Sequence, residues 1–358
     1  MPASAQPTTM AAMAKRAIEK KRVILGKIGP KAGGVKERRA AAASDAAPVP
    51  DPERRVDVKV GFSCNNKCLF CVQGEKRHKV GDFSTAEVKR TLDDARATAD
   101  SIVFTGGELT LRKDVIELVR YAKSLDFKVI QVQTNGRMLA YPKFVDELVG
   151  AGANEFSPAL HGHVAALHDW LTGAPGSFDQ TCRGIRNVKE RGMFVLTNSV
   201  ITKPNFRHLA DLARLLVRLG VDQYQLAFVH PVGSAGANFD AIVPRMAMIE
   251  PHVKAGLTVG IKAGRSVMTE AIPYCFMQGF ERHVAERIIP RTKIFDAGLV
   301  IDDYTAFRQT EGKARGPGCP RCLHFSYCEG PWREYPERLG WDEFVPVPPP
   351  KAPGRRAS

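Results

Sequence analysis

Short runs rich in β-branched residues alternate with longer, helix-length segments through the middle of the chain. The runs predict strands, and the segments between them predict helices. The predicted strands are Val56–Phe62, Ser101–Thr105, Val129–Thr134, Glu155–Ala159, Phe194–Val200 and Gln223–Val229. The predicted helices are Thr85–Ala99, Asp114–Leu125, Pro142–Gly150, Gln180–Arg191 and Phe206–Leu219. This alternation predicts a parallel sheet with right-handed helical crossovers.

The six predicted strands set the expected size of the fold. Six units are more than a small doubly wound domain needs and fewer than the eight of a complete barrel. We therefore expect an α/β fold, a partial (β/α)6 TIM-like barrel whose site lies at the carboxyl ends of the strands. Two helix starts, Ser84-x-x-Glu87 and Ser177-x-x-Gln180, carry the capping-box pattern.

The composition changes on both sides of this alternation. Residues 1–54 are poor in aromatic residues and end in Ala/Pro-rich sequence, which predicts a basic disordered tail. The barrel core is expected over residues 55–235. Gly- and Pro-rich sequence follows, so we expect a small cysteine-bearing domain over residues 236–344 and an extended Pro-rich tail over residues 345–358.

The positive charge of the chain is concentrated near its N-terminus. The net charge is +14, and residues 1–55 hold twelve Lys and Arg against five Asp and Glu. We favour a solvated tail over an arm for RNA, an acidic peptide or a membrane surface, or a transit peptide. No run of eighteen uncharged apolar residues and no secretory signal occurs, so a cytoplasmic protein that does not span a membrane is expected.

Six of the eight cysteines fall into two tight triplets. Disulfide frameworks are typical of small secreted domains, whereas clustered cysteines in an intracellular enzyme indicate a metal site. Cys182 lies alone in a predicted helix and is expected in the core. The other seven are Cys64, Cys68, Cys71, Cys275, Cys319, Cys322 and Cys328.

The first triplet, Cys64, Cys68 and Cys71, has C-x3-C-x2-C spacing directly after the first predicted strand. A [4Fe–4S] cluster usually takes four cysteines, so three in one loop leave one iron open to a substrate or cofactor. The alternative is a zinc site, which needs a fourth protein ligand such as His78.

With Phe70 before its last cysteine, this triplet resembles the signature of the radical S-adenosylmethionine (radical SAM) superfamily. Gly106-Gly107-Glu108, directly after the second predicted strand, resembles the GGE motif of that superfamily. Glycines let the backbone approach a ligand closely. The resemblance implies that Glu108 accepts a hydrogen bond from the ammonium group of S-adenosylmethionine.

The resemblance also implies cofactor contacts from Ser157 and Asn198, near the ends of the fourth and fifth strands, with Thr134 and Asn135 as weaker candidates. The expected chemistry is reductive cleavage of S-adenosylmethionine to a 5′-deoxyadenosyl radical, which abstracts hydrogen from a substrate. The cofactors carry this chemistry, so no catalytic side chain is assigned. An electron donor such as flavodoxin or ferredoxin is the implied partner.

The second triplet, Cys319, Cys322 and Cys328, has C-x2-C-x5-C spacing. It resembles the start of the SPASM pattern but departs from it at Trp332, where a cysteine is expected. The resemblance therefore implies a shorter, twitch-like extension with a second iron–sulfur cluster, and a structural zinc ion is the alternative. Cys275 is either a further ligand or a buried thiol.

The remaining candidates are polar residues near predicted strand ends. We expect His161, His163 and His168 to line a pocket, with metal binding as the alternative, and Thr172–Phe178 to form a loop that closes over substrate. His230 either faces the cavity or lies in the core.

The function expected is that of a radical SAM enzyme acting on a peptide or small molecule. One alternative is a radical SAM enzyme that modifies RNA, supported only by the basic tail and not favoured. The other alternative is a zinc-stabilised nucleic-acid-binding protein.

Overall fold

Nine strands form one sheet in a computed structural model that describes residues 51–349. Their order is β7-β6-β5-β4-β3-β2-β1-β8-β9, and all neighbours are parallel except β8 and β9. The strands are β1 (Asp51–Lys59), β2 (Ala99–Thr105), β3 (Val129–Thr134), β4 (Glu155–Pro158), β5 (Phe194–Ile201), β6 (Gln223–Phe228), β7 (Ser266–Glu270), β8 (Arg291–Asp296) and β9 (Leu299–Ile301).

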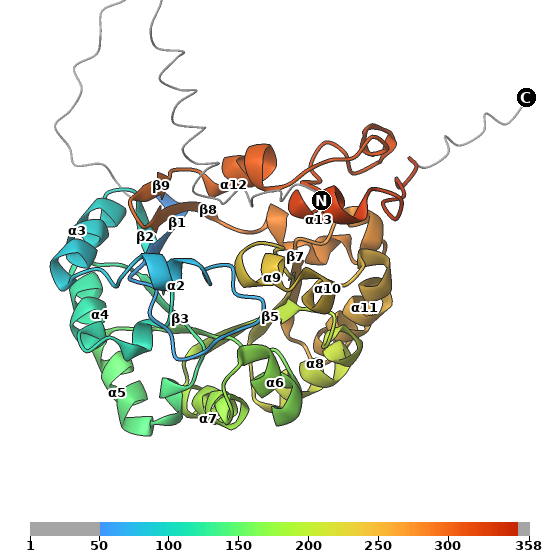
Figure 1. Cartoon of the computed structure of the whole chain (residues 1–358). Coiled ribbons are helices and arrows are strands. Elements are labelled where there is room, and N and C mark those ends of the chain that lie inside the picture. The colour runs from blue at the N-terminus through green and yellow to red at the C-terminus, as the bar shows by residue number, and fades with distance from the viewer. Residues whose placement is uncertain (1–50, 350–358) are drawn as a thin grey trace, which may run out of the picture. The chain divides into compact units, whose positions relative to one another are not determined.

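The longer helices form a ring outside the strands, as Figure 1 shows. The ring is interrupted between α11 and α3, where β8, β9, α12 and α13 lie. The helices are α2 (Lys76–Lys79), α3 (Thr85–Arg96), α4 (Val115–Ser124), α5 (Pro142–Ala151), α6 (Ala165–Thr172), α7 (Ser177–Glu190), α8 (Leu209–Arg218), α9 (Gly233–Ala237), α10 (Phe239–Ile242), α11 (Met246–Lys262), α12 (Tyr304–Phe307) and α13 (Glu334–Leu339). The expected α/β partial barrel is confirmed.

All six predicted strands are present, but the sheet extends beyond them at both ends. β1 begins at Asp51, so residues 51–54 belong to the sheet rather than to the predicted tail. The sheet also continues past residue 235, because β7 pairs with β6 and β8 pairs with β1. The described residues belong to one compact unit. Residues 1–50 of the predicted tail and residues 350–358 lie outside the described residues.

Glycines explain why α11 was not predicted from the sequence. A Cβ atom on Gly260 would lie 2.3 Å from Tyr224 Oη and 2.4 Å from Val267 Cγ1, so the helix approaches β6 and β7 closely only without that side chain. The Tyr224 hydroxyl donates a hydrogen bond to the Gly256 carbonyl across the same contact, at 2.6 Å. Gly- and Pro-rich composition here reflects tight helix–sheet packing rather than a loop.

The two faces of the sheet differ in polarity. On one face, residues such as Ile130, Phe156 and Val195 are buried in the core that the outer helices cover. On the other, polar residues of neighbouring strands stand in register across the barrel interior, because successive strand residues point to opposite faces. These interior residues are Gln131, Gln133, Glu155, Ser157, Asn198, Gln225 and Glu270.

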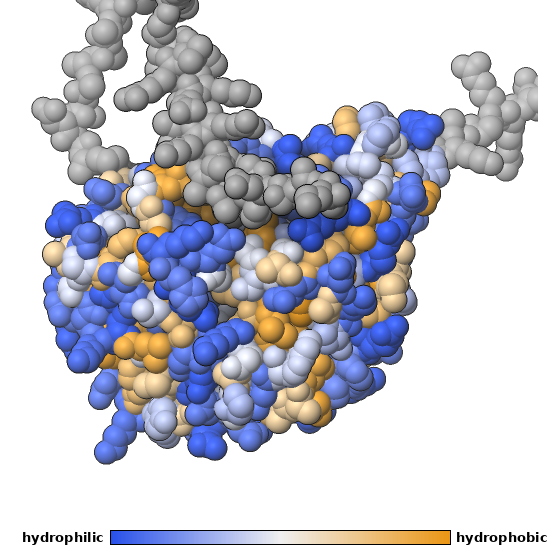
Figure 2. All heavy atoms as spheres, in the orientation of Figure 1, coloured by the Kyte–Doolittle hydropathy of each residue, from blue (hydrophilic) through white to orange (hydrophobic). Residues whose placement is uncertain are grey.

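No helix within residues 51–349 combines the length and hydrophobicity that crossing a bilayer requires. On the face drawn in Figure 2, polar residues predominate and apolar residues form separate patches.

A buried ion network fastens the C-terminal region to the rest of the fold. The guanidinium group of Arg308 donates two hydrogen bonds of 2.9 Å to Glu329. Lys313 contacts the same carboxylate at 3.2 Å and also pairs with Glu286, whose carboxylate accepts the Ala271 N–H just after β7. Arg308 and Lys313 are almost fully buried. Each charge is therefore stable only while its partners are in place.

Replacing Arg308 with Met should destabilise the fold by about 3 kcal/mol or more, because Glu329 then keeps only Lys313 as a counter-charge. Urea-induced unfolding of the anaerobically prepared protein measures this loss. Arg90→Met removes an exposed arginine of α3 and should change stability by less than about 0.5 kcal/mol. Equal effects of the two substitutions would contradict the structural role of the network.

Candidate active site

Cys64, Cys68 and Cys71 lie together in the loop between β1 and α2, half-buried and without disulfide partners. The Cys71 N–H donates to the Cys68 carbonyl at 3.2 Å, and the Asn66 N–H points at Cys64 Sγ at 3.4 Å. Burial raises the pKa of Cys68 to about 12, and repulsion from the thiolates of Cys71 and Cys64 adds to this rise. The thiol of Cys68 therefore lies close enough to the other two for their charges to interact.

Backbone hydrogen bonds hold one side of this cysteine loop to the C-terminal end of α6. The N–H groups of Lys67 and Leu69 donate to the carbonyls of Thr172 and Leu171, at 2.8 and 3.0 Å. Gly173 then leaves α6 with a φ of +59°, and a Cβ atom there would lie 2.8 Å from the Lys67 carbonyl oxygen. The approach of the two segments thus requires glycine at this position.

Residues that follow β3 hold the other side of the loop. The Asn135 amide donates to Asn65 Oδ1 at 2.7 Å, and Arg137 donates to the Asn65 carbonyl at 2.7 Å and to Asn66 Oδ1 at 3.1 Å. Gln180 on α7 accepts a further hydrogen bond from Arg137 at 2.6 Å. The sequence interpretation missed Arg137, because only the tertiary structure brings it to the cysteine loop.

The GGE segment packs directly against the same loop. The Gly107 N–H donates to the Gly61 carbonyl at 2.8 Å, and the Glu108 N–H donates to the Ser63 carbonyl at 2.7 Å. A Cβ atom on Gly106 would lie 2.4 Å from the Gly61 oxygen, and one on Gly107 would lie 2.3 Å from the Ser63 oxygen. In the structure, then, these glycines permit contact between two backbone segments, whereas the sequence suggested close approach to a ligand.

Glu108 is a buried carboxylate with a fixed orientation. Its Oε1 atom accepts hydrogen bonds from the hydroxyls of Thr110 and Thr134, at 2.5 and 2.6 Å, and Oε2 accepts one from the Asn135 N–H at 2.6 Å. Burial raises the pKa of Glu108, and these hydrogen bonds oppose the rise. Because Oε2 has a single protein donor, it retains capacity for a donor from a ligand.

Ser157 and Asn198 lie on the interior face of the sheet. Ser157 is buried on β4 and stands in register with Gln133. Asn198 lies on β5 in register with Gln225, and its Oδ1 atom is buried without a hydrogen-bond partner among the described residues. A buried acceptor without a partner is costly, so this atom fits a donor supplied by a bound molecule.

The expected pocket histidines separate into two groups. His161 and His168 are buried. The Val200 N–H donates to His161 Nδ1 at 3.2 Å, and the His161 N–H donates to His168 Nδ1 at 3.1 Å. Burial lowers the pKa of His161 to about 3 and that of His168 to about 4. Both are therefore neutral residues of the interior rather than pocket-lining groups, while His163 lies at the surface hollow described below.

The expected closing loop at Thr172–Phe178 is instead the fixed junction of α6 and α7. The predicted capping box at Ser177 is wrong, since Ser177 already lies inside α7. The Asp169 carboxylate accepts the N–H groups of Gly176 and Phe178, both at 2.7 Å. The predicted box at Ser84, by contrast, is confirmed.

Four cysteines line a second cavity. Cys275, in a turn after β7, joins Cys319, Cys322 and Cys328 there, together with apolar residues such as Phe325. Burial raises the pKa of Cys275 to about 12, and repulsion from the other three thiolates adds to the rise. The structure thus places Cys275 beside the second triplet. The sequence had left open whether Cys275 lies near these cysteines.

The number of thiols in each cysteine group bears on the metal group that it could hold. The first loop offers three thiols, one fewer than the four protein ligands of a closed structural zinc site. The second cavity offers four, which meets the ligand count of a structural zinc site and of a [4Fe–4S] cluster alike. The first donor set therefore suits a cluster with one open iron, and the second suits either group.

His230 does not extend freely into the interior. Its ring stacks on Trp332 with centroids 3.9 Å apart, and its Nε2 atom lies 3.2 Å from Glu334. Trp332, which occupies the position of the expected SPASM cysteine, is itself buried. It packs in the hydrophobic core, and its neighbour in the chain, Pro331, lines the second cavity.

Comparison with known proteins agrees with this site. The sequence profile of the Radical SAM superfamily matches residues 58–216, which include the first cysteine triplet and the GGE segment. An AdoMet-dependent heme synthase of Nitratidesulfovibrio vulgaris is 30% identical over 187 residues, which cover 52% of this chain and 50% of that protein. A probable GTP 3′,8-cyclase of Metallosphaera sedula is 30% identical over 198 residues, 52% of this chain and 59% of that protein. The chain spans little more than half the length of these relatives.

Solved structures show the same fold at low sequence identity. Streptococcus suis SuiB bound to S-adenosylmethionine superimposes with a TM-score of 0.59 at 16% identity, over 78% of this chain and 72% of SuiB. SuiB bound to the precursor peptide SuiA gives a TM-score of 0.56 at 16% identity, over 86% of this chain and 75% of SuiB. The profile match, together with the three-cysteine loop and the GGE segment that contacts it, assigns residues 58–216 of this chain to the Radical SAM superfamily.

Proposed function

We propose that this chain binds a [4Fe–4S] cluster through Cys64, Cys68 and Cys71 and reductively cleaves S-adenosylmethionine on it. The observation that carries the proposal is the contact between the three-thiol loop and the GGE segment, which sets the buried Glu108 beside the thiols' loop. When bound, the cluster and S-adenosylmethionine would supply the electron and the 5′-deoxyadenosyl radical that abstracts a substrate hydrogen. A reduced flavodoxin or ferredoxin is the proposed electron donor.

The chain's own residues position the cofactor. Glu108 would accept the methionine ammonium through Oε2, and the surrounding hydrogen bonds fix the carboxylate before the ligand arrives. Asn198 Oδ1 would accept a donor of the same molecule, which resolves its missing partner. Ser157 lies on the same interior face and is the third proposed contact.

A second iron–sulfur cluster is proposed in the cavity of Cys275, Cys319, Cys322 and Cys328. Four thiols meet the usual ligand count of a [4Fe–4S] cluster, so this site has no open iron. It contrasts with the first loop, where three thiols leave one position for S-adenosylmethionine. The C-terminal region is thus proposed to act as a SPASM/twitch-like extension despite Trp332.

The polarity of the barrel interior supports a peptide or another amide-bearing substrate. From β3 to β7 the interior polar residues are amides, hydroxyls and the carboxylates Glu155 and Glu270, with no cation among them. Gln131 donates to Glu155 at 2.9 Å and Gln225 to Glu270 at 2.5 Å, an arrangement that suits amide partners. SuiB, which has a similar fold, binds the precursor peptide SuiA, and this likeness also favours a peptide substrate.

Replacing Cys68 with Ala should remove about four irons per chain, one [4Fe–4S] cluster, and reduce release of 5′-deoxyadenosine to background. The measurement combines iron and sulfide analysis of anaerobically reconstituted protein with product quantification after dithionite and S-adenosylmethionine are added. The matched control, Cys182→Ala, removes a buried thiol of α7 outside both cysteine groups and should keep the iron content. Full activity of Cys68→Ala would refute the proposed function.

Glu108→Gln should weaken binding of S-adenosylmethionine about 10- to 100-fold, since a charged hydrogen bond contributes about 1.5–3 kcal/mol. Equilibrium binding to the reconstituted protein measures the change. Glu117→Gln alters an exposed carboxylate of α4 that pairs with Lys89, and should leave binding unchanged. If both variants bind S-adenosylmethionine equally well, Glu108 does not contact it.

The triple substitution Cys319/Cys322/Cys328→Ala should halve the iron content while the first cluster remains, because each [4Fe–4S] cluster holds about four irons. Cys275→Ala separates the two interpretations of this thiol: a ligand should alter the electron paramagnetic resonance signal of the second cluster, whereas a simple core residue should not. Full iron content in the triple variant would show that these cysteines hold no second cluster.

A further inference from the structure

A second group of metal-binding side chains lies away from both cysteine groups, where two loops at the carboxyl ends of β4 and β5 meet. His163 comes from the loop between β4 and α6. His208 ends the short turn Phe206–His208 directly before α8, and Asp211 lies in the first turn of that helix. One ligand atom of each residue lies within 4.8 Å of the other two.

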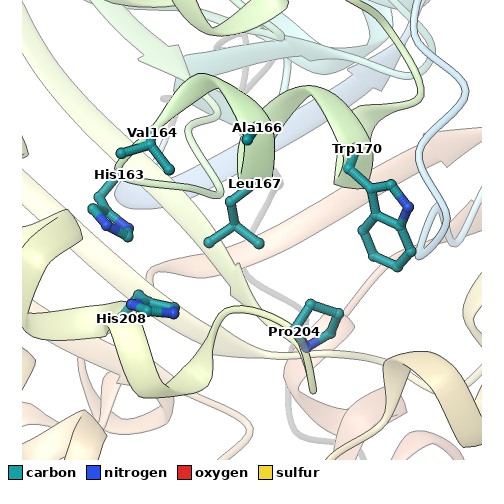
Figure 3. A pocket seen from close by; sticks show the side chains of 7 residues that line it. All are labelled: His163, Val164, Ala166, Leu167, Trp170, Pro204 and His208. Atoms are coloured by element: carbon teal, nitrogen blue, oxygen red, sulfur yellow. The ribbon is translucent and has the colours of Figure 1, made fainter.

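The two imidazole rings face each other across this junction. Their centroids are 4.8 Å apart with an interplanar angle of 27°, and Figure 3 shows the rings on opposite sides of the same gap. His208 and Asp211 are three residues apart, a spacing that places both on one side of the helix start. Bonds of about 2.0–2.1 Å in tetrahedral geometry hold such ligand atoms about 3.4 Å apart, so rotations of these side chains would bring the two nitrogens and the carboxylate oxygen to one ion.

Polar atoms at this junction have unused capacity. The Nδ1 atom of His163 is buried and has no hydrogen-bond partner among the described residues. Asp211 uses Oδ1 to accept a 2.6 Å hydrogen bond from Arg214, while Oδ2 lies 3.8 Å from His208 Nδ1, beyond hydrogen-bond distance. Asp211 is about half exposed, so solvent can reach its free oxygen, and the buried His163 nitrogen is the atom whose missing partner a ligand would supply.

We propose that His163, His208 and Asp211 bind one divalent transition-metal ion, with zinc as the best match. Two imidazoles and one carboxylate form a mixed nitrogen and oxygen donor set that suits Zn²⁺ and similar ions. Mg²⁺ and Ca²⁺ prefer oxygen ligands alone, so the site discriminates against them.

The site has room for an exchangeable ligand. The rings of His163 and His208 form one end of a surface hollow whose other walls are the apolar side chains of Leu167, Trp170 and Pro204 (Figure 3). Three protein ligands leave the fourth tetrahedral position of the ion for water or another small ligand. The open side therefore differs from a closed structural zinc site.

Metal binding here would cross-link the segment before α6 to the start of α8. The far end of α6 accepts the backbone hydrogen bonds of Lys67 and Leu69 in the cysteine loop. The ion would thus hold in place a helix that positions the first cysteine triplet. This proposal does not depend on the reaction proposed above, because none of its ligands belongs to a cysteine group.

Titration of the full chain with zinc chloride, after anaerobic reconstitution of its cysteine sites, tests the proposal. Calorimetry gives the affinity, and zinc and iron analysis after desalting gives the stoichiometry. We expect one zinc per chain with no loss of iron. His208→Ala and Asp211→Asn should each weaken zinc binding by at least about tenfold, the lower limit for even outer-shell partners of metal sites.

Two control variants distinguish this site from non-specific binding. Arg214→Ala removes the ion pair of Asp211 but keeps the proposed ligand, so zinc should bind as tightly as before or more tightly. His78→Ala removes an exposed histidine of α2 and should also leave binding unchanged. Zinc binding that is absent, that persists unchanged in His208→Ala and Asp211→Asn, or that occurs only as iron is lost would overturn the proposal.

Discussion

The contact between two backbone segments, each directly after a strand, determines the geometry of the candidate active site. Gly107 and Glu108 donate to the carbonyls of Gly61 and Ser63, and the contact is close enough that a single Cβ atom at either glycine of the GGE segment would collide with it. Because the two strands, β1 and β2, are paired in parallel, their carboxyl ends bring these segments to the same edge. The cysteine loop and Glu108 are thereby fixed relative to each other before any cofactor binds.

Further contacts surround this central one and restrict the cysteine loop on its other sides. The end of α6 accepts backbone hydrogen bonds from the loop, and Asn135 and Arg137 bind it from the end of β3. An otherwise exposed loop carrying three thiols therefore has little freedom to rearrange. Such restriction suits the proposed cluster site, because it holds the three thiols in place before a cluster binds.

The C-terminal region depends on a different kind of interaction. Arg308 and Lys313 are buried with Glu329, the residue after Cys328, and with Glu286 near β7. Buried charges of this kind impose one geometry more than they add stability, because any other arrangement leaves a charge without its partner. The network thus specifies where the second group of cysteines lies relative to the sheet. Four cysteines gather around one cavity as a result.

The sequence by itself determined the local features of this protein. β-branched runs located the six strands of the barrel, and the short spacing within C-x3-C-x2-C kept three thiols in one loop, so both could be predicted without tertiary information. The capping box of Ser84 and Glu87 was equally predictable, since all its atoms lie within one helical turn. Local patterns succeed here because neighbouring residues alone decide the outcome.

Only the tertiary structure decided the features that join distant segments. The sequence suggested that Cys275 was either a ligand or a buried thiol, and the fold brought it to residues more than forty positions away. The sequence also suggested that the histidines of one loop form a single group. In the structure His161 is buried, whereas His163 lies next to His208 of another loop. The glycines of α11 made this part of the sequence look like a loop. The sequence alone does not distinguish a glycine needed for close helix–sheet packing from a glycine needed in a turn. Contacts across the barrel depend on how strands and helices pack, and no local pattern of residues encodes that packing.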